Sequence, residues 1–104
     1  MVLLEFSMSP FDKGESLSAS VALIIDYIDK SGVPYQLTGM GTILEGEWED
    51  VMGVVDGCFR IMRQSSSRIS LQLKMDYREG DTPRLKKKVE KIETILQRKL
   101  NTAD

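Results

Sequence analysis

The chain has 104 residues, of which 41% are hydrophobic and 29% charged, and its formal net charge is −2. These values are typical of one small globular domain spanning residues 1–104, and the negative charge argues against a general nucleic-acid-binding protein. The sequence has no histidine and one cysteine, which excludes a Ser-His-Asp or Cys-His catalytic arrangement and an intrachain disulfide.

The first predicted strand covers residues 2–8, where apolar and other side chains alternate. One face carries Val2, Leu4, Phe6 and Met8, and the other carries Leu3, Glu5 and Ser7. A helix is predicted to begin at Ser16 or Ser18, since either serine could cap it. Its apolar positions follow the helical period: Leu17, Val21, Ile24, Ile25 and Ile28. Ser31-Gly32 and then Pro34 are expected to end it.

Two short strands, 35–38 and 42–45, come next and are joined by the turn "TGMG". A second helix is predicted after Gly46, because apolar residues recur there at steps of three and four. These residues are Trp48, Val51, Met52, Val55, Phe59 and Met62. We predict that Trp48 packs in the core and that Cys58, beside this stripe, is buried as a small apolar side chain.

The last strand is predicted over Ile69–Tyr77, where alternation is strict, and it is followed by a third helix. Thr82 is the expected N-cap and Pro83 the first helical residue. The apolar stripe of this helix is Leu85, Val89, Ile92 and Leu96. Its start is basic, with Arg84, Lys86, Lys87 and Lys88. A solvated lysine-rich face is the simpler interpretation, and an anionic group at the helix start is the alternative.

The element order is β-α-β-β-α-β with an additional C-terminal helix, which predicts an α+β, ferredoxin-like sandwich. Right-handed crossovers place the first two helices on one face of an antiparallel sheet and leave the other face open. The open face is expected to present Leu3, Glu5 and Ser7, and from the last strand Gln72, Lys74 and Asp76. Glu5 and Lys74 are expected to be neighbours that form an ion pair. Either another subunit or a ligand is expected to cover this face, and another subunit is the favoured of the two.

The turn between the two short strands carries the clearest chemical signal. Its glycines permit positive φ and close approach of another group to the backbone. Thr38 and Thr42 add hydroxyls and Glu45 adds a carboxylate, so a small heterocycle with amino and ring-nitrogen groups would find partners there. A tight hairpin whose glycines serve only the turn is the alternative, and spacing alone favours it.

The segment "MGTILEGEW" followed by "EDVMGVV", with "SLSASVALII" and "LKMDYREGD", resembles the thiamine-binding protein family over nearly the whole chain. The resemblance implies a ferredoxin-like fold, commonly assembled into homotetramers, that binds thiamine or its hydroxymethylpyrimidine portion without known catalysis. The family motif G-T-x-x-E-G falls on Gly41, Thr42, Glu45 and Gly46. The ligand-binding residues expected on this basis are Ser7, Ser18, Thr38, Met40, Gly41, Thr42 and Glu45.

The expected function is therefore non-catalytic binding of thiamine or a related pyrimidine, phosphorylated or not, by a homotetramer or homodimer. No cofactor, nucleic-acid partner or membrane association is expected. A cytoplasmic location is expected from the single cysteine and from the absence of an export signal or a long apolar run. The alternative is a protein–protein assembly or regulatory module that uses the open sheet face.

Overall fold

The computed structural model describes residues 1–11, 17–80, 85 and 87–101. The side chains of residues 17, 18, 87 and 88 are not among the described groups. The predictions for Thr82, Pro83, Arg84 and Lys86 therefore lie outside the described residues.

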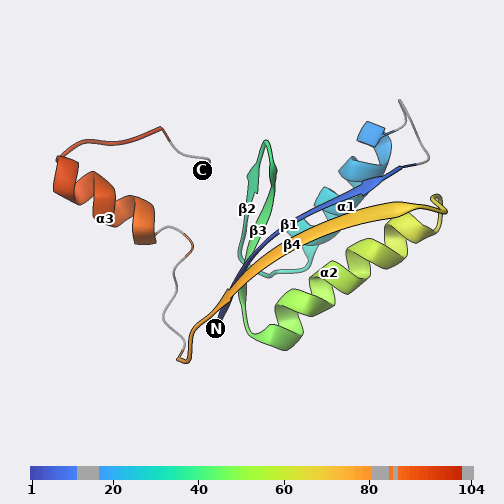
Figure 1. The fold of residues 1–104 in the computed structure, drawn as a ribbon, viewed down its shortest axis with the longest axis horizontal. Coiled ribbons are helices and arrows are strands. Elements are labelled where there is room, and N and C mark those ends of the chain that lie inside the picture. Colours follow the sequence, from blue (N-terminus) through green and yellow to red (C-terminus); the bar gives the residue numbers. More distant parts are fainter. Residues whose placement is uncertain (12–16, 81–84, 86, 102–104) are drawn as a thin grey trace.

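The described elements follow the predicted order. They are β1 (Val2–Pro10), α1 (Leu17–Lys30), β2 (Tyr35–Thr38), β3 (Gly41–Gly46), α2 (Trp48–Arg63), β4 (Ile69–Tyr77) and α3 (Lys87–Leu96). The four strands form one antiparallel sheet in the order β2-β3-β1-β4. Both α1 and α2 pack on one side of this sheet (Figure 1). The fold is thus α+β and ferredoxin-like, as predicted.

β1 is a central strand, and its alternation decides which side of the sheet is buried. Val2, Leu4 and Phe6 are 0%, 0% and 3% exposed, and they contribute to a core that also contains residues of α1, α2 and β3. Each such side chain stabilises the fold by roughly 1.5–3 kcal/mol when fully buried. The predicted assignment of the two faces of this strand is confirmed.

The end of α1 shows why the sequence Ser31-Gly32 stops a helix. The Ser31 hydroxyl donates to the Ile28 carbonyl at 2.6 Å, which satisfies one of the acceptors that a helix end leaves open. Gly32 follows with φ of +79°, a conformation that residues with a side chain rarely adopt. The chain therefore leaves the helix at the predicted position.

The face that α2 buries differs from the predicted stripe. Trp48 is 49% and Phe59 38% exposed, whereas Val54 and Cys58 are buried. The prediction that Trp48 is a core residue is wrong, and the prediction for Cys58 is confirmed. Trp48 and Phe59 are eleven residues apart, which is close to three full turns, so both lie on one flank of the helix. The helical period places both residues near the apolar stripe of α2. It does not show where the contact between α2 and the sheet ends.

The apolar residues of β4 lie on the helix side of the sheet, yet they are exposed. Leu4 is directly opposite Met75 and Phe6 is opposite Leu73, so these pairs point to the same side. The exposed fractions are 44% for Leu71, 41% for Leu73, 42% for Met75 and 59% for Tyr77. The reason is that α1 and α2 pack over β1 and β3 rather than over this edge strand.

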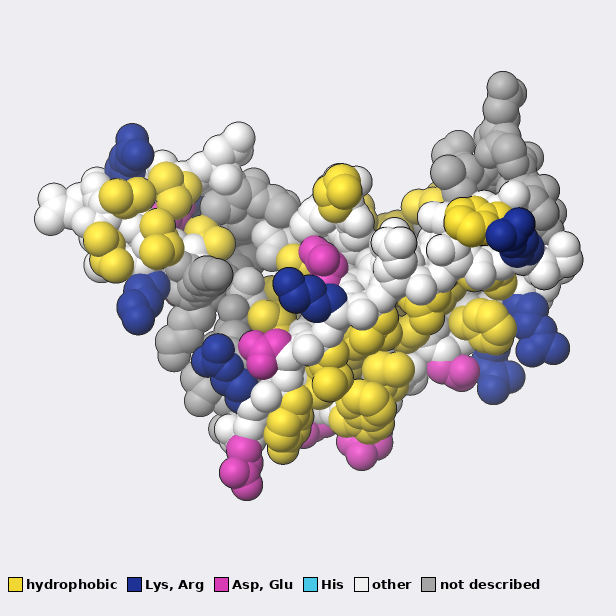
Figure 2. Space-filling view, in the orientation of Figure 1, with side chains coloured by type: hydrophobic (Ala, Val, Ile, Leu, Met, Phe, Trp, Pro, Cys, Tyr) yellow, Lys and Arg dark blue, Asp and Glu magenta, His cyan; other side chains and the backbone are white. Residues whose placement is uncertain are grey.

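This exposed surface is called the apolar flank below. It consists of Leu71, Leu73, Met75 and Tyr77 of β4, and Trp48 and Phe59 of α2. Figure 2 shows hydrophobic side chains as a band over β4 and α2. Single exposed apolar residues are common, whereas a group of this kind is typical of an interaction surface.

The third helix lies apart from the sheet (Figure 1). Its described part begins at Lys87, and Ile92, Ile95 and Leu96 are 40%, 66% and 46% exposed. Within the described part of the chain, no helix is both long enough and apolar enough to cross a lipid bilayer.

The Cys58 thiol should be unreactive in the folded protein. Its side chain is buried, and burial raises its pKa from the ordinary 9.0 to about 12, because a thiolate is poorly stabilised away from water. The folded protein should therefore hold roughly a thousandfold less thiolate at pH 8 than the unfolded chain. A colorimetric disulfide reagent should react slowly without denaturant and at once in guanidinium chloride. Immediate reaction without denaturant would contradict this burial.

Candidate functional site

The predicted site begins at the turn between β2 and β3, which the Thr38 hydroxyl closes. This hydroxyl accepts hydrogen bonds from the backbone N–H groups of Met40 and Gly41, each at 3.1 Å. It also donates to the Gly41 carbonyl at 2.9 Å. The side chain of Met40 projects from the turn and is 86% exposed. Thr38 therefore stabilises the hairpin, and Met40 is the part of the turn that solvent reaches most easily.

Gly41 is required by close packing and not by its backbone angles. A Cβ atom at this position would lie 2.8 Å from the Phe6 carbonyl oxygen and 3.8 Å from Cγ of Glu5. The first distance is too short for a real contact. Among the described glycines only Gly32 and Gly80 have positive φ. Neither Gly39 nor Gly41 therefore adopts the positive φ that glycines permit in a turn.

Thr42 and Glu45, the two motif side chains, face opposite sides of the sheet. Thr42 is opposite Phe6 of β1 and lies on the helix side, whereas Glu45 is opposite Leu3 and lies on the side without helices. Both residues are 5% exposed. The sheet therefore prevents the Thr42 hydroxyl and the Glu45 carboxylate from meeting one ring together.

The remaining predicted residues separate into two groups on the helix-free face. Ser7 and Gly41 lie toward the turn end of this face, while Glu45 pairs with Leu3. Ser7 and Leu3 are four positions apart on β1, which is roughly 13 Å at the usual rise of a strand. The side chain of Ser18, in α1, lies outside the described groups. The structure therefore brings only some of the predicted ligand-binding residues close to one another.

The centre of the helix-free face combines aliphatic and acidic side chains. Leu3 and Ile43 are half-buried, and Glu5, directly opposite Ile43, is exposed. The two carboxylate residues, Glu5 and Glu45, are thus diagonal neighbours across β1 and β3. Glu45 makes at least one interaction within the molecule. Glu5 was missing from the predicted site, since the cross-strand register that places it beside Ile43 cannot be read from the sequence.

Glu5 and Lys74 are directly opposite each other, as predicted. The ion pair expected between them is not formed, because these two described residues have no N–O contact within 4.0 Å. Glu5 therefore keeps its carboxylate available on the helix-free face. Among the described residues, no group of three or more cysteine, aspartate or glutamate side chains could hold a metal ion.

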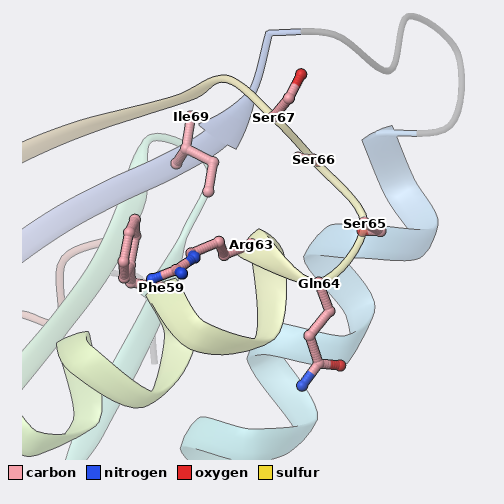
Figure 3. A pocket seen from close by; sticks show the side chains of 7 residues that line it. All are labelled: Phe59, Arg63, Gln64, Ser65, Ser66, Ser67 and Ile69. Carbon is pink, nitrogen blue, oxygen red and sulfur yellow. The ribbon is translucent and has the colours of Figure 1, made fainter.

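A separate hollow of about 720 Å³ lies on the helix side, where α2 ends and β4 begins. Its lining residues are Phe59, Arg63, Gln64, Ser65, Ser66, Ser67 and Ile69 (Figure 3). The Arg63 guanidinium is 6.0 Å from the centre of the Phe59 ring, and Ile69 points toward that ring. The buried Ser66 hydroxyl has no hydrogen-bond partner among the described residues. None of the predicted ligand-binding residues lines this hollow.

Comparison with protein families matches residues 4–93 to the family described as "Thiamine-binding protein". A UPF0045 protein from Mycobacterium bovis is 35% identical over 98 residues, covering 93% of this chain and 96% of the relative. A UPF0045 protein from Methanothermobacter thermautotrophicus is 32% identical over 95 residues, covering 88% and 96%.

Solved structures with the same fold agree with this match. A Thermotoga maritima protein assigned provisionally to thiamine biosynthesis or salvage superposes with a TM-score of 0.76 and 28% identity, covering 88% of this chain and 97% of that one. A hypothetical protein from Methanocaldococcus jannaschii superposes with a TM-score of 0.78 and 26% identity, covering 88% and 94%.

The two glycines of the turn should respond differently to a methyl group. Gly41→Ala should destabilise the fold by about 1–3 kcal/mol, because the Phe6 carbonyl group belongs to the paired strand and cannot move away without disturbing that pairing. Gly39→Ala is the matched control, because a Cβ there meets nothing within 4 Å, and it should change stability by less than about 0.5 kcal/mol. Urea denaturation of both variants measures the difference. Equal midpoints would show that the close approach at Gly41 does not limit stability.

Proposed function

The chain belongs to the thiamine-binding protein family, and we propose that it binds thiamine, or a closely related pyrimidine, on the helix-free face of its sheet. The observation that carries the proposal is the pairing of carboxylates with aliphatic residues on that face. Glu5 lies opposite Ile43, and Glu45 lies opposite Leu3. Such a surface suits a flat, positively charged ring, because the aliphatic groups pack against it and the carboxylates balance its charge.

The thiazolium ring of thiamine carries that positive charge. Glu5 is exposed and without an ion pair to Lys74 across the strands, so it attracts a cation without first losing a partner. Glu45 is buried beside Leu3, where a charge interaction is stronger than in open water. We assign the cationic ring to this end of the face.

The aminopyrimidine ring is assigned to the turn end. Ser7 offers a hydroxyl, and the exposed side chain of Met40 can pack on the ring. Gly41 remains a proposed contact of the ring, next to the Thr38 hydroxyl to which its backbone N–H and C=O groups already bond. Thr38 and Thr42 act indirectly, since the first closes the turn and the second lies on the helix side. Ser18 remains a proposed contact by its position at the start of α1.

The spacing of the two ends favours a ligand with two rings. Ser7 and Leu3 are four residues apart on β1, roughly 13 Å, so a single pyrimidine ring reaches only one end. Thiamine should therefore bind more tightly than hydroxymethylpyrimidine. A phosphorylated form would add an anionic group, for which the basic residues before α3 are the proposed partners.

We propose further that the protein is cytoplasmic, that it forms a homotetramer or homodimer, and that it binds its ligand without converting it. The support for a binding role is the family and the absence of histidine from the sequence, which removes the commonest general base at neutral pH. The proposed oligomer accounts for an apolar flank that is left exposed in one chain.

The alternative function is a regulatory or assembly module that binds another protein through the helix-free face. The half-buried Leu3 and Ile43 favour this alternative, because aliphatic groups on a sheet face also suit a protein partner. The two functions differ in a simple respect: only the first requires a small molecule.

Calorimetric titration with thiamine, thiamine phosphate and hydroxymethylpyrimidine tests the proposal. Glu5→Gln and Glu45→Gln should each weaken thiamine binding by about ten- to hundredfold, because each removes one charged hydrogen-bond partner. Neither substitution should weaken hydroxymethylpyrimidine binding, since that molecule lacks the thiazolium charge.

Glu90→Gln, on the exposed surface of α3, is the matched control, as it removes the same charge at a distance from the face. It should leave thiamine affinity unchanged, and circular dichroism should show that all variants are folded. No heat and no thermal shift with any of the ligands at millimolar concentration would reject the small-molecule function in favour of the protein-binding alternative.

A further inference from the structure

We infer that the hollow between the end of α2 and the start of β4 is a second binding site, and that it takes a phosphate monoester whose organic part is an apolar ring. In this arrangement the phosphate group lies against Arg63 and Ser66, and the ring packs on Phe59 and Ile69. The hollow is on the helix side of the sheet, whereas the proposed thiamine site is on the helix-free face. The inference therefore goes beyond the proposed function and does not depend on it.

The Ser66 hydroxyl is a buried polar group that lacks a partner. Ser66 lines the hollow and is 6% exposed, and its hydroxyl makes no hydrogen bond to any described residue. A buried hydroxyl without a hydrogen bond costs free energy, so nearly all such groups in native proteins have a partner. A change of rotamer about the single side-chain torsion of serine turns this hydroxyl toward a ligand in the hollow. A phosphate oxygen there would supply the missing acceptor.

Arg63 supplies the positive charge of the hollow. Its guanidinium lies 6.0 Å from the centre of the Phe59 ring, and Figure 3 shows the side chain extended from the end of α2 toward that ring. Arg60, three residues earlier, pairs with Asp56 at 2.8 Å, whereas no carboxylate of the described residues lies within 4.0 Å of Arg63. Arg63 therefore keeps its donors available, and a planar guanidinium can hold two oxygens of one phosphate group.

The charges around the hollow favour an anion. The described residues that line it include one guanidinium and no carboxylate, and Figure 2 shows Lys and Arg side chains gathered at this end of the molecule. The carboxyl end of α2 carries the negative end of the helix dipole, which opposes an anion. This opposing effect is weaker than one charge-assisted hydrogen bond to an arginine, and Arg60 and Arg63 in the last turn of the helix offset it.

The hollow is larger than a phosphate ion and has an apolar side. Its volume of about 720 Å³ is within the range of pockets that hold organic ligands. Phe59 is 38% exposed and Ile69 is half-buried, and the Ile69 side chain points toward the Phe59 ring (Figure 3). A bare phosphate ion would leave both side chains uncovered, whereas an apolar ring beside the phosphate would bury them. The ligand class therefore includes both an anion and a ring.

The two proposed sites differ in charge and should therefore bind different molecules. Glu5 and Glu45 give the helix-free face carboxylates that suit the cationic thiazolium ring, whereas Arg63 gives the hollow a charge that repels this ring. Unphosphorylated thiamine should therefore not bind in the hollow.

Calorimetric titration of the full chain with phenyl phosphate, inorganic phosphate and phenol tests the ligand class. Phenyl phosphate should bind about tenfold more tightly than inorganic phosphate or phenol, since it alone contacts both the charged and the apolar side of the hollow. No heat with phenyl phosphate at millimolar concentration would overturn the inference. Equal affinity for phenyl phosphate and either of the other two compounds would overturn it as well.

Replacement of Arg63 tests whether the anion is held at this site. Arg63→Gln should weaken phenyl phosphate binding by about tenfold or more, because it removes the charged partner. Arg60→Gln is the matched control, since it removes the same charge from the same turn of α2, but Arg60 pairs with Asp56 and does not line the hollow. It should change the affinity by less than about twofold. An equal loss in both variants would show a general response to charge and would overturn the site.

Replacement of Ser66 separates a binding role from a structural one. Ser66→Ala should weaken phenyl phosphate binding by about tenfold. The midpoint of urea denaturation should not fall, because a hydroxyl without a partner does not stabilise the fold. A lower midpoint with unchanged affinity would show that the hydroxyl is bonded within the protein, and it would overturn the inference.

Nuclear magnetic resonance locates the site without any substitution. Phenyl phosphate should shift the backbone amide signals of residues 63–69, and thiamine should shift those of β1 and β3. Shifts by phenyl phosphate confined to other segments would overturn the inference. Binding of thiamine without binding of phenyl phosphate would reject the second site alone, and the reverse result would support it while rejecting the proposed thiamine function.

Discussion

The pairing of β1 with both β3 and β4 is the constraint on which the rest of the molecule depends. Leu4 is held between Leu44 and Met75, and Glu5 is held between Ile43 and Lys74. Since neighbours across a sheet point to the same side, the alternation of β1 fixes the side on which each of their side chains lies. A slip by one residue would carry every buried apolar group of β1 to the helix-free face. The depth of burial of Val2 and Leu4 makes that slip too costly.

The sequence was sufficient to predict the elements and their order, because strands and helices differ in the period of their apolar residues. It was insufficient to predict what each apolar row touches. Leu71 and Leu73 follow the same alternation as Leu4 and Phe6, but the described helices leave them partly exposed. The exposure of Trp48 has the same origin. Whether an apolar residue is buried depends on where the neighbouring element lies, which is a property of the tertiary arrangement and not of any single segment.

The candidate site illustrates the same limit at the level of chemistry. Thr42 and Glu45 are three residues apart in one motif, and on a strand an odd separation places them on opposite sides. The motif therefore combines a buried threonine on the helix side with a carboxylate on the helix-free side, where we propose that the ligand binds. Glu5 joins that carboxylate only through the register between β1 and β3, so it could not be identified before the strand pairing was known.

The single tryptophan gives the molecule an intrinsic optical probe. Trp48 is the sole indole in the chain and is about half exposed, so its emission depends on whether water or protein lies against the ring. Its position on the flank of α2, away from the helix-free face, means that its fluorescence should respond to the proposed association between copies and should be largely insensitive to events on the opposite side of the sheet. The proposed assembly can thus be tested at low concentration without attaching a dye.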